Sequence, residues 1–223
     1  GGGGMWFPCN PVLRRKGSDD TIEEALTYFH AVVGDRTPRE LQDAFVRGGA
    51  RLIEYLEQDE GFAFSVLPWP DYFGSAPGAR SDGLRHIVCK PLPGDALGPN
   101  IGKVRGPLDN ERFGAAAPDL LTGGRALVGR FLAALRRFPH ATTHLNSPLT
   151  DLITENGAVV GVEVRRDGKQ VRIGARRGVL LAAGGFERNA EMRHTFEVPG
   201  RVEDTMGGPG STGDAHEAAI RVG

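Results

Sequence analysis

The sequence predicts an α/β fold, and three observations support this prediction. Amphipathic helical patterns occupy much of the first sixty residues and recur after residue 122. Strand-like segments joined by tight turns follow over residues 149–173, which indicates a three-stranded antiparallel meander. A short apolar run, Val179–Leu181, then ends in two alanines and two glycines, as a buried strand does where its backbone must approach a ligand.

Length and composition narrow the class of protein. The 223 residues are enough for one large domain or parts of two, and the net charge of −1 indicates neither nucleic acid nor an anionic membrane surface as a partner. The apolar stretches are shorter than the ~20 residues of a transmembrane helix, and no signal peptide is visible. Cys9 and Cys89 are too few for a metal cluster or a disulfide framework, so we expect buried thiols and a cytoplasmic location. The basic run Arg14–Lys16 is interpreted as a solvated face.

Two helices are predicted before residue 57. Asp20 followed by Glu23 resembles a capping box for the first helix, and Gly34 provides its stop. Pro38 opens the second helix. Its apolar side is expected to carry Leu41, Phe45, Leu52, Ile53 and Leu56.

The middle of the chain is less regular. Residues 61–67 alternate as a short strand does, whereas residues 68–118 are rich in Pro, Gly and Asp and show little periodicity. So long a segment in a compact domain is usually functional or disordered. A helix is predicted after Thr122, and its buried face should consist of Ala126, Leu127, Phe131, Leu132 and Leu135.

The last third should form the meander and a glycine-rich turn. Leu149–Thr154 and Val159–Arg165 flank Asn156-Gly157, which is a strong hairpin signal, and Gln170–Ile173 supplies the third strand. The small residues at 182–185 leave room for a ligand, and the following N–H groups can bind a phosphate. This pattern indicates a nucleotide site at the carboxyl end of a Rossmann-like sheet.

Four segments resemble the flavin-dependent 3-ketosteroid Δ1-dehydrogenases, within the fumarate reductase/succinate dehydrogenase flavoprotein superfamily. These segments are Gly1–Pro8, Pro70-Asp71-Tyr72-Phe73, Lys103–Gly129, and Asn146–Arg193 together with Ser211–Ala215. The resemblance implies FAD as cofactor, a steroid as substrate, and 1,2-dehydrogenation by removal of a C2 proton and transfer of a C1 hydride to flavin N5. The electron acceptor and the oligomeric state are not indicated.

The resemblance assigns cofactor contacts to three small-residue segments and one leucine. Gly2, Gly3 and Gly4 would pass beside the isoalloxazine, and the alternative is a flexible or artificial tail. Ala183, Gly184 and Gly185 would approach FAD closely, although a tight turn alone also explains them. Thr212, Gly213 and Asp214 would line the FAD site as well as cap a helix. Leu149 would use its backbone against the adenine, or is a core leucine.

The resemblance also assigns two substrate-facing aromatic residues. Tyr72 would face the steroid and hydrogen-bond to the catalytic base, helping a group with a free pKa of about 10 to lose its proton. Trp69 would line the steroid pocket. The alternative for both residues is ordinary packing within a long loop. None of the six histidines has the spacing of a metal site.

The chain is therefore expected to be an internal fragment. Residues 1–223 would form a partial FAD-binding domain without the N-terminal nucleotide fingerprint and the C-terminal cap domain, and residues 68–121 would be its active-site loop region. A processed natural N-terminus is the alternative to a fragment. Two functional alternatives also stand. One is another superfamily enzyme, such as a fumarate or enoate reductase or a Δ4-ketosteroid dehydrogenase, and the other is a non-catalytic fragment.

Overall fold

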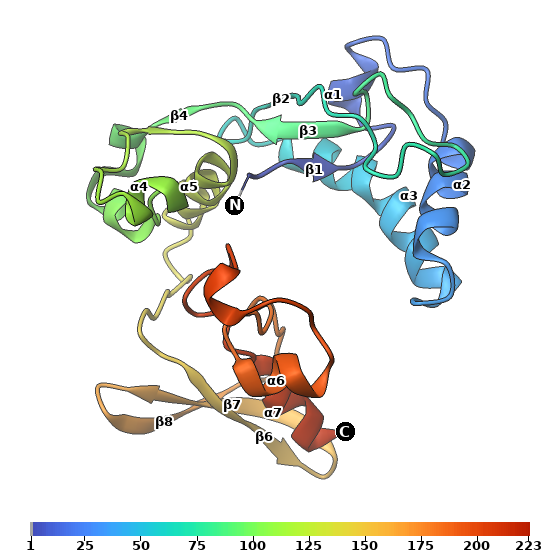
Figure 1. Ribbon diagram of the computed structural model, residues 1–223. Helices are drawn as coiled ribbons and strands as arrows, with labels where there is room; N and C mark the ends of the chain where they lie inside the picture. The colour runs from blue at the N-terminus through green and yellow to red at the C-terminus, as the bar shows by residue number, and fades with distance from the viewer. Residues whose placement is uncertain (1) are drawn as a thin grey trace. The chain divides into compact units, whose positions relative to one another are not determined.

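The computed structural model describes residues 2–223, which divide into two compact units (Figure 1). The first unit ends at Ala141, and the second comprises Thr142–Gly223. The first is a mixed assembly of helices around short antiparallel strands, and the second is a meander that carries two helices.

A three-stranded antiparallel sheet lies at the centre of the first unit. Its order is β1 (Met5–Trp6), β3 (His86–Cys89) and β2 (Phe64–Val66), so β3 pairs with both neighbours. The sequence predicted β2, but it did not predict β3 within the Pro/Gly-rich segment. A strand of four residues is too short for its hydrophobic alternation to stand out from the surrounding loop sequence.

Helices α1 (Pro11–Arg14), α2 (Ile22–Val33) and α3 (Arg39–Leu56) accompany this sheet. Gly34 ends α2 with φ +63°, as predicted. The predicted capping box is wrong, because Thr21 caps α2 and accepts a hydrogen bond from the Glu24 amide. Asp20 points elsewhere, into a buried ion pair.

The predicted apolar side of α3 is only partly correct. Ile53 is fully buried, but Leu41, Phe45 and Leu52 are each 45 % exposed or more. The buried positions of α3 are Gln42, Val46, Gly49 and Ile53. Phe45 still stacks on Phe29 at a ring-centroid distance of 5.2 Å, so it covers the α2–α3 contact from outside.

The rest of the first unit extends the main core. Strands β4 (Leu92–Pro93) and β5 (Leu120–Leu121) pair with each other, and 3-10 turns over Gly94–Lys103 and helix α4 (Leu108–Arg112) lie between them in sequence. Helix α5 (Gly123–Leu135) follows, as predicted, and buries Ala126. Phe131 and Leu135, by contrast, remain more than 40 % exposed. The core cluster collects buried residues from α1, α3, β2, β3, the 3-10 turns, β5 and α5, among them Leu13, Ile53, Phe64, Ile87, Leu97, Leu121 and Ala126.

The second unit contains the predicted meander. Strands β6 (Leu149–Glu155), β7 (Ala158–Arg166) and β8 (Lys169–Gly174) pair antiparallel in that order. Asn156 and Gly157 form the first turn with φ +51° and +77°, which confirms the hairpin signal. Helices α6 (Ala190–Thr195) and α7 (Asp214–Val222) follow, with a 3-10 turn at Val202–Asp204 between them. Helix α7 lies against β6, where the Arg221 guanidinium binds the Thr150 carbonyl at 2.9 Å.

The predicted buried strand at Val179–Leu181 is wrong for this structure. These residues have no strand conformation, and Leu180 is 90 % exposed. A strand exists only where a neighbour satisfies its N–H and C=O groups, and no described strand pairs with this run. No helix among the described residues is long and apolar enough to cross a membrane.

Candidate functional site

The predicted glycine segment at the start of the chain packs against the start of α5. A methyl group added to Gly3, which has φ +74°, would lie less than 3.0 Å from the Gly124 amide nitrogen. A methyl group on Gly123 would in turn meet the Gly2 carbonyl. Gly3 is thus fixed by close backbone packing, while the Cα of Gly2 faces open space. This environment differs from that of a free tail.

The predicted aromatic pair lies on the loop after β2. Trp69 is 50 % exposed and Tyr72 is 77 % exposed, with ring centroids 6.5 Å apart. The Tyr72 ring also meets the edge of the buried His86 ring at 6.3 Å. Both aromatic rings therefore present apolar surface to the outside of this unit instead of filling its core.

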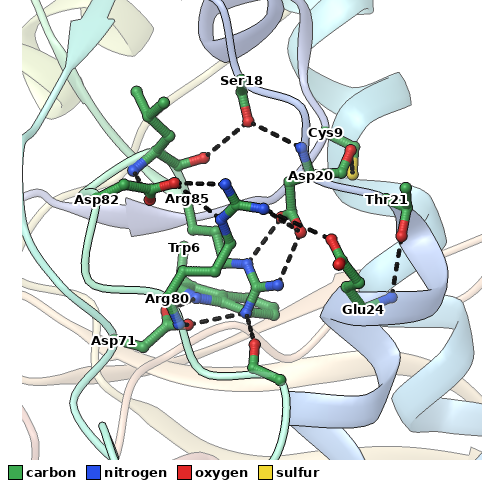
Figure 2. Close-up of polar contacts among 12 residues, drawn as sticks. Trp6, Cys9, Ser18, Asp20, Thr21, Glu24, Asp71, Arg80, Asp82 and Arg85 are labelled. Atoms are coloured by element: carbon green, nitrogen blue, oxygen red, sulfur yellow. Dashed lines mark hydrogen bonds and ion pairs between the residues drawn. The ribbon is translucent and has the colours of Figure 1, made fainter.

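A buried ion-pair network lies directly behind this loop (Figure 2). The Arg85 side chain is 1 % exposed and binds Asp20 through Nε and NH2, both at 2.7 Å. Its NH1 donates to Asp71 Oδ2 at 2.8 Å and to the Gly78 carbonyl at 2.9 Å. Burial alone would lower the pKa of Arg85, but the bonds and charges of the two aspartates outweigh burial and raise it.

No local sequence pattern indicates this network. Buried aspartate and arginine are almost always paired, yet no local pattern identifies the partner when 65 residues separate the two. The available signal was Arg85 itself, a charged residue directly before the apolar run Ile87–Cys89. An arginine next to a short buried strand is expected to pair with a buried carboxylate.

The second unit brings two of the predicted cofactor segments side by side. The Arg188 amide donates to the Ser211 carbonyl at 2.9 Å, and the Asn189 side chain donates to the Thr212 carbonyl at 2.9 Å. Gly184 has φ +82°, and a methyl group there would contact Ser211 Oγ at 3.5 Å. The turn after residue 182 and the loop before α7 therefore form one surface.

A hollow of about 290 Å³ opens on this surface. Its lining consists mostly of the small residues Ala182, Ala183, Gly184, Ala215 and Ala219, together with Leu181 and His216. Gly213, not Thr212 or Asp214, occupies the cap position of α7, and no side chain caps this helix. The predicted side-chain cap is therefore wrong. Leu149 begins β6 opposite Val164 and is not among the residues that line the hollow.

The arrangement in the second unit fits a dinucleotide. Polar ligand groups can approach the backbone at Ala183 and Gly184 because no bulky side chain intervenes. Thr150 Oγ1 and Glu187 Oε2 are buried and have no hydrogen-bond partner within the described residues. The Glu187 carboxylate can only accept hydrogen bonds, so it suits a hydroxyl group of a ligand and not a phosphate.

The two cysteines are not suited to nucleophilic chemistry. Cys9 and Cys89 are buried free thiols, as predicted, and burial followed by the charge of Asp20 raises the pKa of Cys9 to about 11. A thiol with so high a pKa is a poor nucleophile. Within residues 2–223, no group of three His, Cys, Asp or Glu side chains is arranged to hold a metal ion.

Comparison with known proteins identifies the family. The model of the FAD binding domain matches residues 1–223. The chain belongs to the FAD-binding domain family. FAD is the cofactor of this family, which confirms the cofactor prediction.

Two curated dehydrogenases are similar to the whole chain. The 3-oxosteroid 1-dehydrogenase of Mycobacterium tuberculosis (strain ATCC 25618 / H37Rv) is 35 % identical, and the alignment covers 100 % of this chain and 46 % of the relative. The 4-oxocyclohexanecarboxylate 2-dehydrogenase of Sinomonas cyclohexanicum is 31 % identical over 100 % of this chain and 42 % of its own length. This FAD-binding domain thus spans less than half the length of these relatives.

A solved structure agrees with the sequence comparison. The 3-ketosteroid Δ1-dehydrogenase from Sterolibacterium denitrificans, in complex with 1,4-androstadiene-3,17-dione, matches with a TM-score of 0.85 and 26 % identity. The match covers 100 % of this chain and 47 % of that one. The predicted resemblance to 3-ketosteroid Δ1-dehydrogenases is confirmed.

Proposed function

We propose that this chain is part of an FAD-dependent dehydrogenase that introduces the C1–C2 double bond of 3-ketosteroids. Whole-chain similarity to 3-oxosteroid 1-dehydrogenases supports the proposal. Within that enzyme, the chain supplies part of a Rossmann-like FAD site and one side of the substrate site. The other catalytic groups, including the base that removes the C2 proton, are assigned to other segments of the protein.

The observation that carries the proposal is the exposed aromatic pair on an anchored loop. Trp69 and Tyr72 offer two ring faces with centroids 6.5 Å apart, on a loop fixed from behind by Asp71. A steroid is a rigid, largely apolar, fused-ring molecule, and burial against aromatic faces stabilises such a ligand. A small dicarboxylate would need cationic side chains here instead.

Tyr72 is assigned a catalytic role at the substrate. Its exposed hydroxyl can donate a hydrogen bond to the group that removes the C2 proton. A hydrogen bond to the charged form of that group stabilises this form and lowers its pKa. Trp69 is assigned a contact with the steroid rings.

FAD, when bound, accepts the two electrons and the hydrogen that leave the substrate. Gly2, Gly3 and Gly4 are assigned to its flavin end. The backbone at Ala183, Gly184 and Gly185, the loop Thr212–Asp214 and the backbone of Leu149 are assigned to the rest of the cofactor. The hollow of about 290 Å³ beside Gly184 supports the assignment of Ala183 and Gly184 to the cofactor site.

The experiment uses the natural gene product with FAD bound. Incubation with androst-4-ene-3,17-dione and an artificial electron acceptor should reduce the acceptor and yield a steroid that has lost two hydrogens at C1–C2. Absence of turnover by the FAD-loaded protein would overturn the proposal. Turnover of a 4-oxocyclohexanecarboxylate in place of the steroid would also overturn it.

A matched pair of variants tests the role of Tyr72. Tyr72→Phe should lower kcat by about 10²-fold or more, a typical loss for a group that assists proton transfer. Tyr55→Phe removes the hydroxyl of another exposed tyrosine, on α3, and should leave kcat unchanged. Equal activities of the two variants would contradict the assignment of Tyr72.

A further inference from the structure

Asp71 occupies a position that joins two parts of the proposed site. Its side chain is almost fully buried, although the next residue, Tyr72, is among the most exposed aromatic residues. Asp71 Oδ1 accepts a hydrogen bond from Trp6 Nε1 at 2.7 Å. Asp71 Oδ2 accepts bonds from Arg85 NH1 at 2.8 Å and from the Arg80 amide at 3.0 Å. Both carboxylate oxygens are therefore engaged, as Figure 2 shows.

The Arg85 side of this contact is held firmly. The guanidinium binds Asp20 with two parallel bonds of 2.7 Å, which is a specific and strong geometry. Its Cζ atom also lies over the rings of Trp6 and Tyr28, at 5.9 Å and 5.6 Å from their centroids. Arg85 cannot shift without breaking several buried contacts, so it provides a fixed point for Asp71.

The loop that carries Tyr72 is fastened on both sides of that residue. The Asp71 amide donates to the Arg80 carbonyl at 2.9 Å, which closes the base of the loop. On the other side, the Phe73 amide donates to the Tyr28 hydroxyl at 3.3 Å. The backbone of Tyr72 is held between these anchors, while its side chain remains outside.

The Trp6 side of the contact leads to the proposed flavin segment. Trp6 ends β1, which directly follows Gly2–Gly4. The bond from Trp6 to Asp71 therefore ties the segment assigned to the flavin to the segment assigned to the substrate, across 65 residues of sequence. A dehydrogenase needs these two sides at a fixed separation, since small misplacements of reacting groups cost large factors in rate.

We propose that Asp71 is a positioning residue, which fixes Tyr72 relative to the flavin-facing glycines through its bonds to Trp6 and Arg85. This inference rests on the proposed function. Asp71 does not touch the substrate in this assignment and acts through Tyr72. The alternative is that Asp71 only stabilises the fold by neutralising Arg85.

Asp20 provides a matched comparison, because it binds the same guanidinium and is equally buried but lies outside the loop. Asp71→Asn and Asp20→Asn should lower Tm to a similar extent. Asp71→Asn should lower kcat by about 10- to 10²-fold, and Asp20→Asn should lower it at least fivefold less. Equal losses of kcat in the two variants would overturn the positioning role.

Two further variants keep the test decisive. Trp6→Phe removes the N–H that bonds to Asp71 Oδ1, keeps an aromatic ring at this position and leaves the ion pairs of Arg85 intact. It should therefore fold even if Asp71→Asn does not, and it should lower kcat about threefold or more at unchanged KM. In a Tyr72→Phe background, Asp71→Asn should cause little further loss of kcat, because its effect passes through Tyr72. Full additivity of the two changes would overturn the proposal.

Hydrogen exchange gives a readout that does not depend on steroid turnover. Asp71→Asn should increase amide exchange at residues 71–80 by at least tenfold, whereas Asp20→Asn should leave this peptide closer to the wild type. Faster exchange in a protein that turns over no steroid would locate the failure in the proposed function. Unchanged exchange with Asp71→Asn would overturn the anchoring itself, whatever the substrate.

Discussion

The backbone of Gly3 lies directly against that of Gly124, and this contact leaves no room for a side chain on Gly3. Gly3→Ala must both strain a left-handed backbone at φ +74° and open this contact. We expect a loss of about 2–4 kcal/mol in the free energy of unfolding, measured by urea titration.

Gly2→Ala is the matched control for that change. A methyl group on Gly2 would meet no atom within 4 Å, so the free energy of unfolding should stay close to that of the wild type. Since Gly2 faces the flavin in the proposed function, Gly2→Ala should reduce the affinity for FAD without changing stability. A tolerated Gly3→Ala would contradict the packing described for this segment.

The Arg85 network should dominate the stability of the first unit. Arg85→Met leaves Asp20 and Asp71 buried without their cation, so we expect a loss of about 3–5 kcal/mol in the free energy of unfolding. Arg15→Met breaks the exposed pair with Glu57 and should cost about 1 kcal/mol or less. Similar losses in the free energy of unfolding of both variants would show that burial does not increase the contribution of the network to stability.

His86 should make stability depend on pH. Burial lowers its pKa below the usual 6.5, and a backbone hydrogen bond at Trp69 opposes the shift only in part. The unfolded chain therefore binds this proton at a higher pH than the folded chain, and stability is lost as the pH falls from 6.5 towards the lower folded-state pKa.

The measurement compares the wild type with His86→Gln, which cannot titrate. Urea unfolding at about pH 7.5 and about pH 5.5 should give a larger decrease in stability for the wild type than for the variant. His30 pairs with Asp43 on the helices and remains in both proteins, so its contribution cancels. An identical pH dependence would mean that His86 titrates normally.

The hollow beside Gly184 should be sensitive to side-chain volume. Ala219→Leu adds three carbons at its lining and should reduce the amount of FAD that copurifies with the natural gene product, measured by flavin absorbance. Ala190→Leu makes the same change at an exposed position on α6 and should retain full occupancy. Full occupancy with Ala219→Leu would place the cofactor elsewhere.

Local sequence signals predicted those elements whose cause is local. The Asn156-Gly157 turn fixes its hairpin by its own φ preferences, and Gly34 ends α2 in the same way. Val179–Leu181 has the composition of a strand but lacks a pairing partner in the structure, and composition cannot supply one. The strand prediction failed for that reason.

The resemblance assigned Trp69 and Tyr72 to the substrate site, and both residues are exposed in the structure. Their role stays a prediction, and the network that anchors their loop was not predicted. Asp20 was interpreted as a helix cap because Glu23 follows at capping distance, whereas its true partner is Arg85. A capping pattern is local, and an ion pair across 65 residues leaves no trace in spacing.

The closure of the loop at Asp71 and Arg80 has a consequence for how this protein can diversify. The two hydrogen bonds between Asp71 and Arg80 hold the base of the loop, whereas Gly74–Pro77 form its tip. The tip can therefore change in length or composition without moving Tyr72. Gly78 is excluded from that freedom, because its carbonyl serves Arg85 and its Cα lies against α2. In the proposed function, the tip is therefore a variable segment beside the steroid, and changes in it could accommodate new ring substituents at little cost to the stability of the fold.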